Sequence, residues 1–379
     1  MSAREQTIEI PTLVECFSPV SDPRIERCKR HKLIDILVIA LCTVITGGQG
    51  PTEMEAFGEA KFDWLKQFLE LPHGIPSHDT FGRVLSLLDP RQFERCLLNW
   101  VNGQIQLGAG EVIPIDGKTL KRSHDKAKGQ EAIEIVSAWA ASERLTLGQV
   151  KVAAGANEIT AVPEVLDLLK IEGATVTVDA MHCQKTTVAK IRQKKADYVV
   201  ALKKNQKHLH DAVEEYLTSV REGRTHGFAI STCQTIDKEH GRLELRKYWQ
   251  ADAPDFLPEK ELWQDLKSVG LVEATREING NATTEVRYYL SSLPVQAQTF
   301  GHAVRTHWGI ENSCHWVLDV VFREDDCRLR VGTAAENMST LRRLAMNLLR
   351  REKSDKRGAQ VKRLRAALNE KYLLKVLRS

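Results

Sequence analysis

Acidic residues follow two short apolar runs of the chain. Asp116 comes directly after residues 112–115, and Asp179 comes directly after residues 174–178. We interpret both runs as strands of an α/β sheet, and the carboxyl ends of such strands are the usual place for a ligand site. Either aspartate alone is as well explained by a turn or a cap. Two such strand ends in succession indicate, weakly, a shared acidic site.

A third acidic residue, Glu311, lies in a segment rich in histidine and tryptophan, residues 307–320. On a helix, His307, Glu311 and His315 have i, i+4, i+8 spacing and therefore share one face. Such a face is a dense group of functional side chains. An ordinary amphipathic helix that buries its tryptophans and exposes Glu311 fits the spacing equally well.

The pattern of the chain changes near residue 106, which predicts distinct parts. Residues 1–105 are predicted to be short helices, either a packing module or a helix-turn-helix that reads DNA. Residues 106–350 show three strands, a helix, a strand, a helix and a strand, which is the order of a ribonuclease-H-like mixed sheet with flanking helices. Within them, residues 205 to about 295 are predicted to be a β-rich insertion. Residues 351–379 are predicted to be a basic helical tail.

Apolar runs and helical spacing predict individual strands and helices in the α/β part of the chain. Strands are predicted over 112–115, 132–141, 145–153, 174–178 and 197–202, and helices over 158–170 and 186–193. Pro114 is an irregularity, because proline lacks the N–H that a central strand donates. We expect it either at the start of its strand or opposite a gap in the ladder.

Composition limits the class of protein. The chain has 379 residues of which 42% are apolar, enough to bury a sizeable core in two or three domains. The longest apolar run, residues 34–45, is too short to span a bilayer, and the N-terminus is not a secretory signal. Eight scattered cysteines without a Cys-x-x-Cys pair favour free thiols. We therefore expect a cytoplasmic protein without a membrane partner.

The net charge of +4 conceals a basic C-terminal region. Between Arg342 and Arg378, thirteen Lys or Arg accompany three Asp or Glu, a local charge of +10, so the remainder of the chain sums to −6. This asymmetry indicates a polyanionic partner, with nucleic acid as the first candidate. A solvated pair of amphipathic helices explains the charge equally well.

The chain resembles the H-repeat-associated transposases, the ISAs group of bacterial insertion sequences. Similar motifs run through most of its length, at residues 31–37, 74–80, 115–120, 157–161, 179–184, 201–206, 240–242, 286–289, 307–312 and 324–326. The resemblance implies a ribonuclease-H-like core with a DDE triad of acidic residues. Asp116 matches the acid of the first strand, Asp179 the acid after the fourth strand, and Glu311 the acid on a late helix.

The activity that the resemblance implies is that of a DNA transposase, which cleaves element ends and joins them to target DNA. Three carboxylates suit a pair of Mg²⁺ or Mn²⁺ ions, because these hard cations prefer carboxylate oxygens. The expected partner is double-stranded DNA, bound by a homodimer. The alternative is an inactive, domesticated transposase that only binds DNA, and the intact triad argues against it.

Basic residues near the expected site are candidates for neutralising DNA phosphates. They are Lys118, Lys121, Arg122, Lys203, Lys204, Lys207 and Arg242. An ordinary surface position is the alternative for each of them.

Alternation gives one candidate DNA surface in the insertion. Arg242, Glu244, Arg246 and Tyr248 share one face of a predicted strand. That face either contacts DNA or is a plain solvent face.

The chain departs from larger cut-and-paste relatives in the Tyr-Arg-Glu-Lys signature around the glutamate. Val304 and His307 occupy the Tyr and Arg positions, and Leu318 occupies the Lys position. The residues of that signature contact DNA phosphates in the relatives. We hypothesise that Arg305 or His307 takes this role here.

Histidine and cysteine residues raise zinc as an alternative. They are His182, Cys183, His307, Cys314, His315 and Cys327. Their spacings match no standard zinc finger, so neutral core residues are the preferred interpretation.

Overall fold

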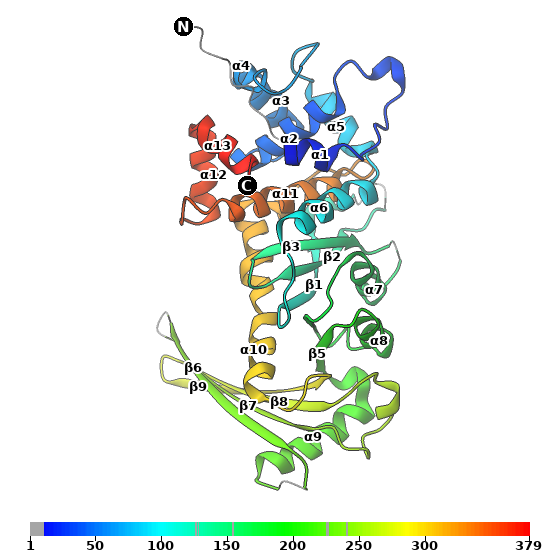
Figure 1. Ribbon diagram of the computed structural model, residues 1–379, viewed down its shortest axis with the longest axis vertical. Coiled ribbons are helices and arrows are strands. Elements are labelled where there is room, and N and C mark those ends of the chain that lie inside the picture. The colour runs from blue at the N-terminus through cyan, green and yellow to red at the C-terminus, as the bar shows by residue number, and fades with distance from the viewer. Residues whose placement is uncertain (1–10, 126, 128, 154, 225–226, 240–241) are drawn as a thin grey trace.

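The computed structural model describes residues 11–125, 127, 129–153, 155–224, 227–239 and 242–379, and at residues 11, 12, 28, 239 and 242 it describes the backbone alone. A helical layer lies at one end of the molecule and the curved strands β6 to β9 lie at the other, with helix α10 between them (Figure 1). The N-terminal helices are α1 (Pro11–Phe17), α2 (Leu33–Thr46), α3 (Pro51–Ala60), α4 (Phe62–Leu65), α5 (His78–Leu87) and α6 (Pro90–Gln104).

Nine strands of the described chain form one sheet in the order β3-β2-β1-β4-β5-β9-β8-β7-β6. The strands are β1 (Val112–Leu120), β2 (Ile133–Ala140), β3 (Leu145–Lys151), β4 (Thr175–Val178), β5 (Asp197–Leu202), β6 (Ile230–Glu239), β7 (Arg242–Asp252), β8 (Ser268–Ile278) and β9 (Asn281–Ser291). Strands β1, β4 and β5 are parallel, and the other neighbours are antiparallel. This confirms the predicted mixed sheet of the ribonuclease-H-like class.

Helices alternate with the strands in the predicted order, and further helices follow the last strand to the C-terminus. They are α7 (Glu158–Leu168), α8 (Lys185–Gln193), α9 (Lys207–Arg221), α10 (Ala297–His307), the π-helical turns η6 (Glu311–His315) and η7 (Val317–Val321), α11 (Ala334–Arg351), α12 (Ala359–Leu368) and α13 (Glu370–Leu377). Helix α7 packs on β2 and β3, α8 packs on β5, and α10 crosses β1, β4 and β5.

Strand β1 is longer than the predicted 112–115, because its pairing with β2 continues from Ile115 to Leu120. Pro114 is opposite Thr177 in the parallel ladder with β4, whereas the ladder with β2 begins only at Ile115. The second of the two expected settings for Pro114, a gap in the ladder, is therefore the one observed.

The strands between residues 205 and 295 extend the same sheet, since β9 pairs antiparallel with β5. Successive residues of β9 point to opposite faces. The ring of Tyr288 contacts His210 of α9 at 5.3 Å, and the ring of Tyr289 contacts Phe300 of α10 at 5.5 Å. Helices α9 and α10 thus cover opposite faces of this half of the sheet, as Figure 1 shows.

Helix α9 is absent from the β-rich prediction for this segment. Its buried residues recur at helical spacing, at Leu209, Val213, Leu217 and Val220. The signal for a helix was therefore present, and the neighbouring strand patterns masked it.

The C-terminal helices complete the N-terminal helical layer. Helices α11 and α12 pack on α2, and the red and blue ends of the chain lie side by side in Figure 1. Arg342 and Arg343 are buried, and the Arg363 guanidinium donates to the backbone carbonyl of Val44 at 2.9 Å. Several charges of the basic region are therefore internal, and these are neither solvated nor exposed to a polyanionic partner.

Helix α2 holds the longest apolar run, and its residues 35–45 are all buried. No single described helix is long and apolar enough to cross a membrane. Helices α2 and α3 reach that length and apolar composition only when they are taken together, and they are bent by 95° relative to each other. The cysteines whose side chains are described are all free thiols.

Candidate active site

Asp116 and Asp179 lie on neighbouring parallel strands. Ile115 is paired with Val178, so the two aspartates are the next residues along β1 and β4. Strand β4 ends at that point, whereas β1 continues along β2. Asp116 therefore lies within its strand and not at its end, which corrects the predicted placement and leaves the predicted pairing of the two acids unchanged.

Glu311 reaches this edge of the sheet through helix α10. At the end of α10, the Nδ1 atom of His307 lies 3.0 Å from the hydroxyl of Thr177, two residues before Asp179 on β4. The π-helical turn η6 follows and carries Glu311 and His315. The element order alone did not predict this π-helical geometry.

The structure brings Asp116 and Glu311 together and adds His315. One ligand atom from each of the three lies within 4.8 Å of the other two. The Nδ1 atom of His315 is 3.4 Å from a carboxylate oxygen of Glu311 and 3.7 Å from one of Asp116. The i+4 spacing identified His315 as a neighbour of Glu311, but sequence reasoning did not assign it to the acidic site.

The pKa values of the two acids in this group are shifted in opposite directions. Burial raises the pKa of Asp116 to about 7, against the opposing effect of His315, and the charges of Glu311 and Asp179 raise it further. A hydrogen bond with His315 lowers the pKa of Glu311. Neighbouring carboxylates disfavour the ionisation of one another, so a bound divalent cation would reduce the repulsion between them.

The donor set fits a divalent cation. Asp116, Asp179 and Glu311 offer hard oxygen ligands, which Mg²⁺ and Mn²⁺ accept. The buried Nε2 atom of His315 has no hydrogen-bond partner, and an imidazole ligand suits transition metals better than Mg²⁺. Two groups of described residues could hold a metal, this one and the group of His210, Asp211 and Glu214. Neither contains a cysteine, so the zinc alternative gains no support.

Glu158, the first residue of α7, is a further carboxylate at the site that sequence reasoning missed. Burial and a hydrogen bond with Glu134 raise the pKa of Glu158 to about 8, and the charges of Asp116 and Asp179 add to the effect. The side chain of Asn157 caps α7 by accepting from the N–H of Ile159. Asn157 and Glu158 begin the motif at residues 157–161, for which the sequence indicated no role.

Lys118 does not have the role that the sequence suggested. Its side chain is buried, and its ammonium lies 2.7 Å from Asp319, 3.1 Å from Asp325 and 3.3 Å from Glu324. The ammonium donates a hydrogen bond to Asp325 and is held among three carboxylates in a buried position, so it is not exposed to DNA phosphate. The expectation of phosphate contact is corrected to a structural ion pair.

Lys121 and Arg122 continue the same network at the surface. The Lys121 ammonium is 2.6 Å from Asp325, and the Arg122 guanidinium is 3.2 Å from Asp326. Both side chains are exposed, so their proposed phosphate contacts would have to compete with these ion pairs.

Lys203 and Lys204 are exposed in the loop after β5. The next residue, Asn205, donates a hydrogen bond of 2.8 Å to the backbone carbonyl of Ala180, directly after Asp179. This loop therefore lies beside the acidic site. The side chain of Arg242, another predicted DNA contact, lies outside the described residues.

A groove of about 670 Å³ lies between the inserted strands β7, β8 and β9 and residues 304–312, and Glu311 is one of its lining residues. We call it the insertion groove, and its lining includes Glu244, Arg246, Tyr248, Arg276, Glu285, Arg287, Tyr289, Arg305, Trp308 and Glu311. Glu244, Arg246 and Tyr248, which were predicted to share a strand face, all line it. The guanidinium of Arg287 stacks over the exposed ring of Trp308 at 4.6 Å.

Arg305 and His307 differ in their suitability for phosphate. Arg305 is half-exposed in the insertion groove, 3.7 Å from Asp237. Burial lowers the pKa of His307 to about 4, so its ring is neutral near pH 7. A phosphate contact by His307 would therefore be a hydrogen bond and not an ion pair.

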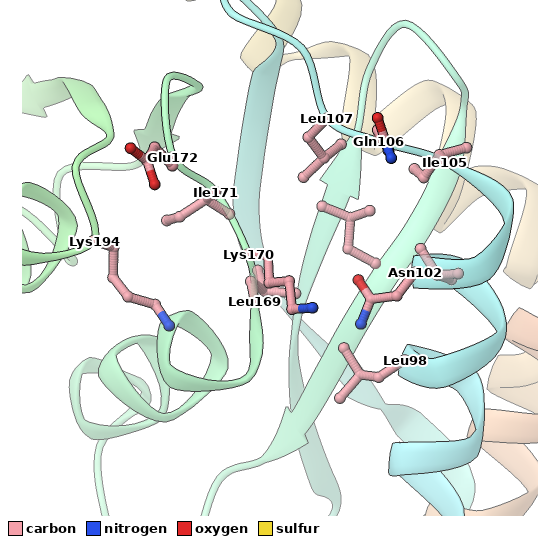
Figure 2. Close-up of a pocket in the computed structure, with 12 residues that line it drawn as sticks. Leu98, Asn102, Ile105, Gln106, Leu107, Leu169, Lys170, Ile171, Glu172 and Lys194 are labelled. Carbon is pink, nitrogen blue, oxygen red and sulfur yellow. The ribbon is translucent and has the colours of Figure 1, made fainter.

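A second large cavity lies at the other end of the parallel strands. Figure 2 shows it between the end of α6 and the segments that precede β1 and β4, lined by residues such as Leu98, Leu107 and Ile171. Lys170 and Lys194 extend from its wall. It is far along the strands from the acids and contains none of the predicted site residues.

Known proteins match nearly the whole chain. Residues 108–348 match the family model "Transposase DDE domain", and residues 14–101 match the model "DDE_Tnp_1-associated". "H repeat-associated putative transposase YhhI" of Escherichia coli K12 is 40% identical over 98% of both chains. "Putative transposase YncI" of Escherichia coli O157:H7 is 41% identical over 98% of this chain and 96% of its own.

Two further matches are a relative that covers only a small part of this chain and a solved structure. "Inactive transposase YbfQ" of Escherichia coli K12 is 43% identical over 21% of this chain and 94% of its own. A solved structure of the piggyBac transposase synaptic complex with hairpin DNA covers 99% of this chain and 79% of that chain, at 14% identity and a TM-score of 0.42. The family model and the near-full-length relatives place this chain in the transposase family that has the DDE domain.

Proposed function

We propose that this chain is an active DNA transposase in which Asp116, Asp179 and Glu311 hold divalent cations for cleavage and strand transfer. The observation that carries the proposal is the meeting of Asp116 with Glu311, which is far away in the sequence and also lines the insertion groove. A structural role for these acids would favour pairing with Lys or Arg. The nearest cationic candidate in this group is instead His315.

The proposed chemistry is phosphoryl transfer. Two cations bound here would activate the attacking oxygen and stabilise the leaving oxygen. In the first step, water attacks a phosphorus at the element end, the bond to the 3′ oxygen breaks, and a 3′-hydroxyl is released. In the second step, that hydroxyl attacks a phosphorus of target DNA, and the target's own 3′ oxygen leaves. Both steps use the same carboxylates and need no covalent protein–DNA intermediate.

The insertion groove is the proposed path of a DNA strand to the carboxylates. Arg246, Arg276, Arg287 and Arg305 line it, and arginine matches phosphate geometry well. Arg246 and Arg287 are paired with acids of their own strands, at Glu244 and Glu285. We infer that these pairs open when phosphate displaces the carboxylates. Lys203, Lys204, Lys121, Arg122 and His307 remain proposed contacts around the site.

In vitro cleavage tests the proposal. The purified chain is incubated with DNA that flanks its own gene, with Mg²⁺, with Mn²⁺ or with EDTA. The expected products carry 3′-hydroxyl ends, which a polymerase extends, and appear only with a divalent cation. Asp116→Ala and Asp179→Ala should bind the same DNA and leave it uncut.

Two further parts of the proposal have separate outcomes. Binding of end DNA without cleavage under every metal condition would favour the alternative of an inactive, domesticated DNA-binding protein. A homodimer on paired ends is expected, and sedimentation of the protein–DNA complex measures it.

A further inference from the structure

We propose that Glu158 is a fourth carboxylate ligand of the divalent-cation site, next to Asp116 and Asp179. This inference rests on the proposed function, because it concerns the same cations. It adds a donor from helix α7, an element that the three-acid arrangement does not use. It also gives a role to the motif at residues 157–161.

The first observation is the position of the Glu158 carboxylate against strand β1. A Cβ atom built on Gly117 would lie only 1.7 Å from Oε1 of Glu158, so the carboxylate occupies the space that a side chain would take. Gly117 directly follows Asp116 and its backbone is not in the left-handed region. Glycine is therefore required here by the approach of Glu158 and not by backbone strain.

The second observation is the unsatisfied imidazole of His182. This side chain is fully buried, and neither ring nitrogen has a hydrogen-bond partner. Its Nε2 atom points between two carboxylates, 3.6 Å from Glu158 and 3.8 Å from Asp179. Buried polar atoms without partners are rare in native structures. A cation with its bound waters would supply the hydrogen-bond partner that His182 lacks and the charge that the carboxylates lack.

The surroundings of Glu158 contain more negative charge than positive charge. Glu134, on β2, hydrogen-bonds with Glu158, and Asp116 and Asp179 are close enough to perturb it. No ion pair joins Glu158 to a Lys or Arg whose position is described. Two arrangements can hold such acids together, a cation between them or a proton shared by Glu134 and Glu158.

Glu158→Gln separates the two arrangements, because glutamine mimics a protonated carboxyl but is a poor ligand for a hard cation. The experiment titrates Mn²⁺ into the full chain by calorimetry. We expect Glu158→Gln to weaken Mn²⁺ binding about tenfold or more, and Glu158→Asp to recover part of the affinity. Glu164→Gln, an exposed glutamate on the same helix, is the matched control and should bind as wild type does.

Gly117→Ala provides an independent test that removes no carboxylate from the chain. Its methyl group should displace Glu158 and reproduce the loss of Mn²⁺ affinity. Gly103→Ala is the control, since a Cβ there meets nothing within 4 Å. Thermal unfolding of each variant identifies any that fails to fold, and Glu158→Asp then decides the question.

Asp116→Asn distinguishes failure of this inference from failure of the proposed function. Loss of Mn²⁺ binding in Asp116→Asn with normal binding in Glu158→Gln would overturn the role of Glu158 alone, and the shared proton would explain its position. Normal binding in both variants, or no Mn²⁺ binding by wild type, would overturn the cation site and this inference together.

Discussion

The ammonium of Lys118 lies 2.7 Å from a carboxylate oxygen of Asp319. This pair joins strand β1, two residues beyond Asp116, to the π-helical turn eight residues beyond Glu311. Burial alone would raise the pKa of the neighbouring Glu324, but Arg343 and Lys118 outweigh it and hold that pKa at about 2. The two segments that carry Asp116 and Glu311, the proposed catalytic acids, are therefore fixed together by buried charges.

Lys118→Met should lower the free energy of unfolding by about 3–5 kcal/mol, because Asp319 loses its cation and buried Glu324 keeps only Arg343. Urea denaturation measures the loss. Lys121→Met is the control, because Lys121 pairs with the same Asp325 from an exposed position and its removal should change stability little. Equal effects of the two substitutions would show that the buried network does not hold the segments together.

The sequence predicted the central part of the fold well because its signals are local. The alternation of apolar strands and amphipathic helices places β2 to β5, α7 and α8 within about two residues of their observed bounds, and β1 differs only in its longer C-terminal end. The joining of β9 to β5 depends on contacts across about ninety residues and has no local signal. Helix α9 had a local signal at Leu209, Val213 and Leu217, which the strand patterns around it obscured.

Glu94→Gln should make the protein more stable relative to wild type as pH rises. Glu94 accepts from the N–H of Gln149 at 2.8 Å and from the hydroxyl of Thr340 at 3.3 Å, in a buried position that raises its pKa to about 7. A raised pKa in the folded state stabilises the protein below the unfolded pKa, and the stabilisation is lost as pH rises to about 7.

The comparison of Glu94→Gln with wild type removes contributions from other groups. Between about pH 5 and pH 7, wild type should lose about 1.4 kcal/mol per pH unit relative to the variant. Urea denaturation at several pH values measures the difference. A difference that stays constant over this range would mean that Glu94 is ionised in the folded protein.

Arg287→Gln and Arg305→Gln should each weaken binding of double-stranded DNA, because both guanidinium groups line the insertion groove beside Glu311. Each substitution should also reduce the slope of log affinity against log salt by about one. Fluorescence anisotropy at several salt concentrations gives both values. Lys170→Gln removes a charge from the cavity in Figure 2 and should leave the slope unchanged. A reduction as large for Lys170→Gln would place the DNA elsewhere.

The three proposed acids were predicted from the sequence for unequal reasons. Asp116 and Asp179 follow short apolar runs, and the parallel pairing of those runs in β1 and β4 places the two aspartates side by side. Glu311 depended on family resemblance, because spacing on a helix does not say which strand the helix crosses. Glu158 and the burial of Lys118 depend on distant segments that meet only in the folded chain.

The central claim is that Glu311 completes a metal-dependent centre for DNA cleavage, and one comparison tests it most directly. Wild type, Glu311→Ala and His302→Ala, an exposed control on the preceding helix α10, are incubated with the flanking DNA and Mn²⁺. Wild type and His302→Ala should cleave the DNA, whereas Glu311→Ala should bind the DNA and leave it uncut. Cleavage by Glu311→Ala at a rate near that of wild type would contradict the claim.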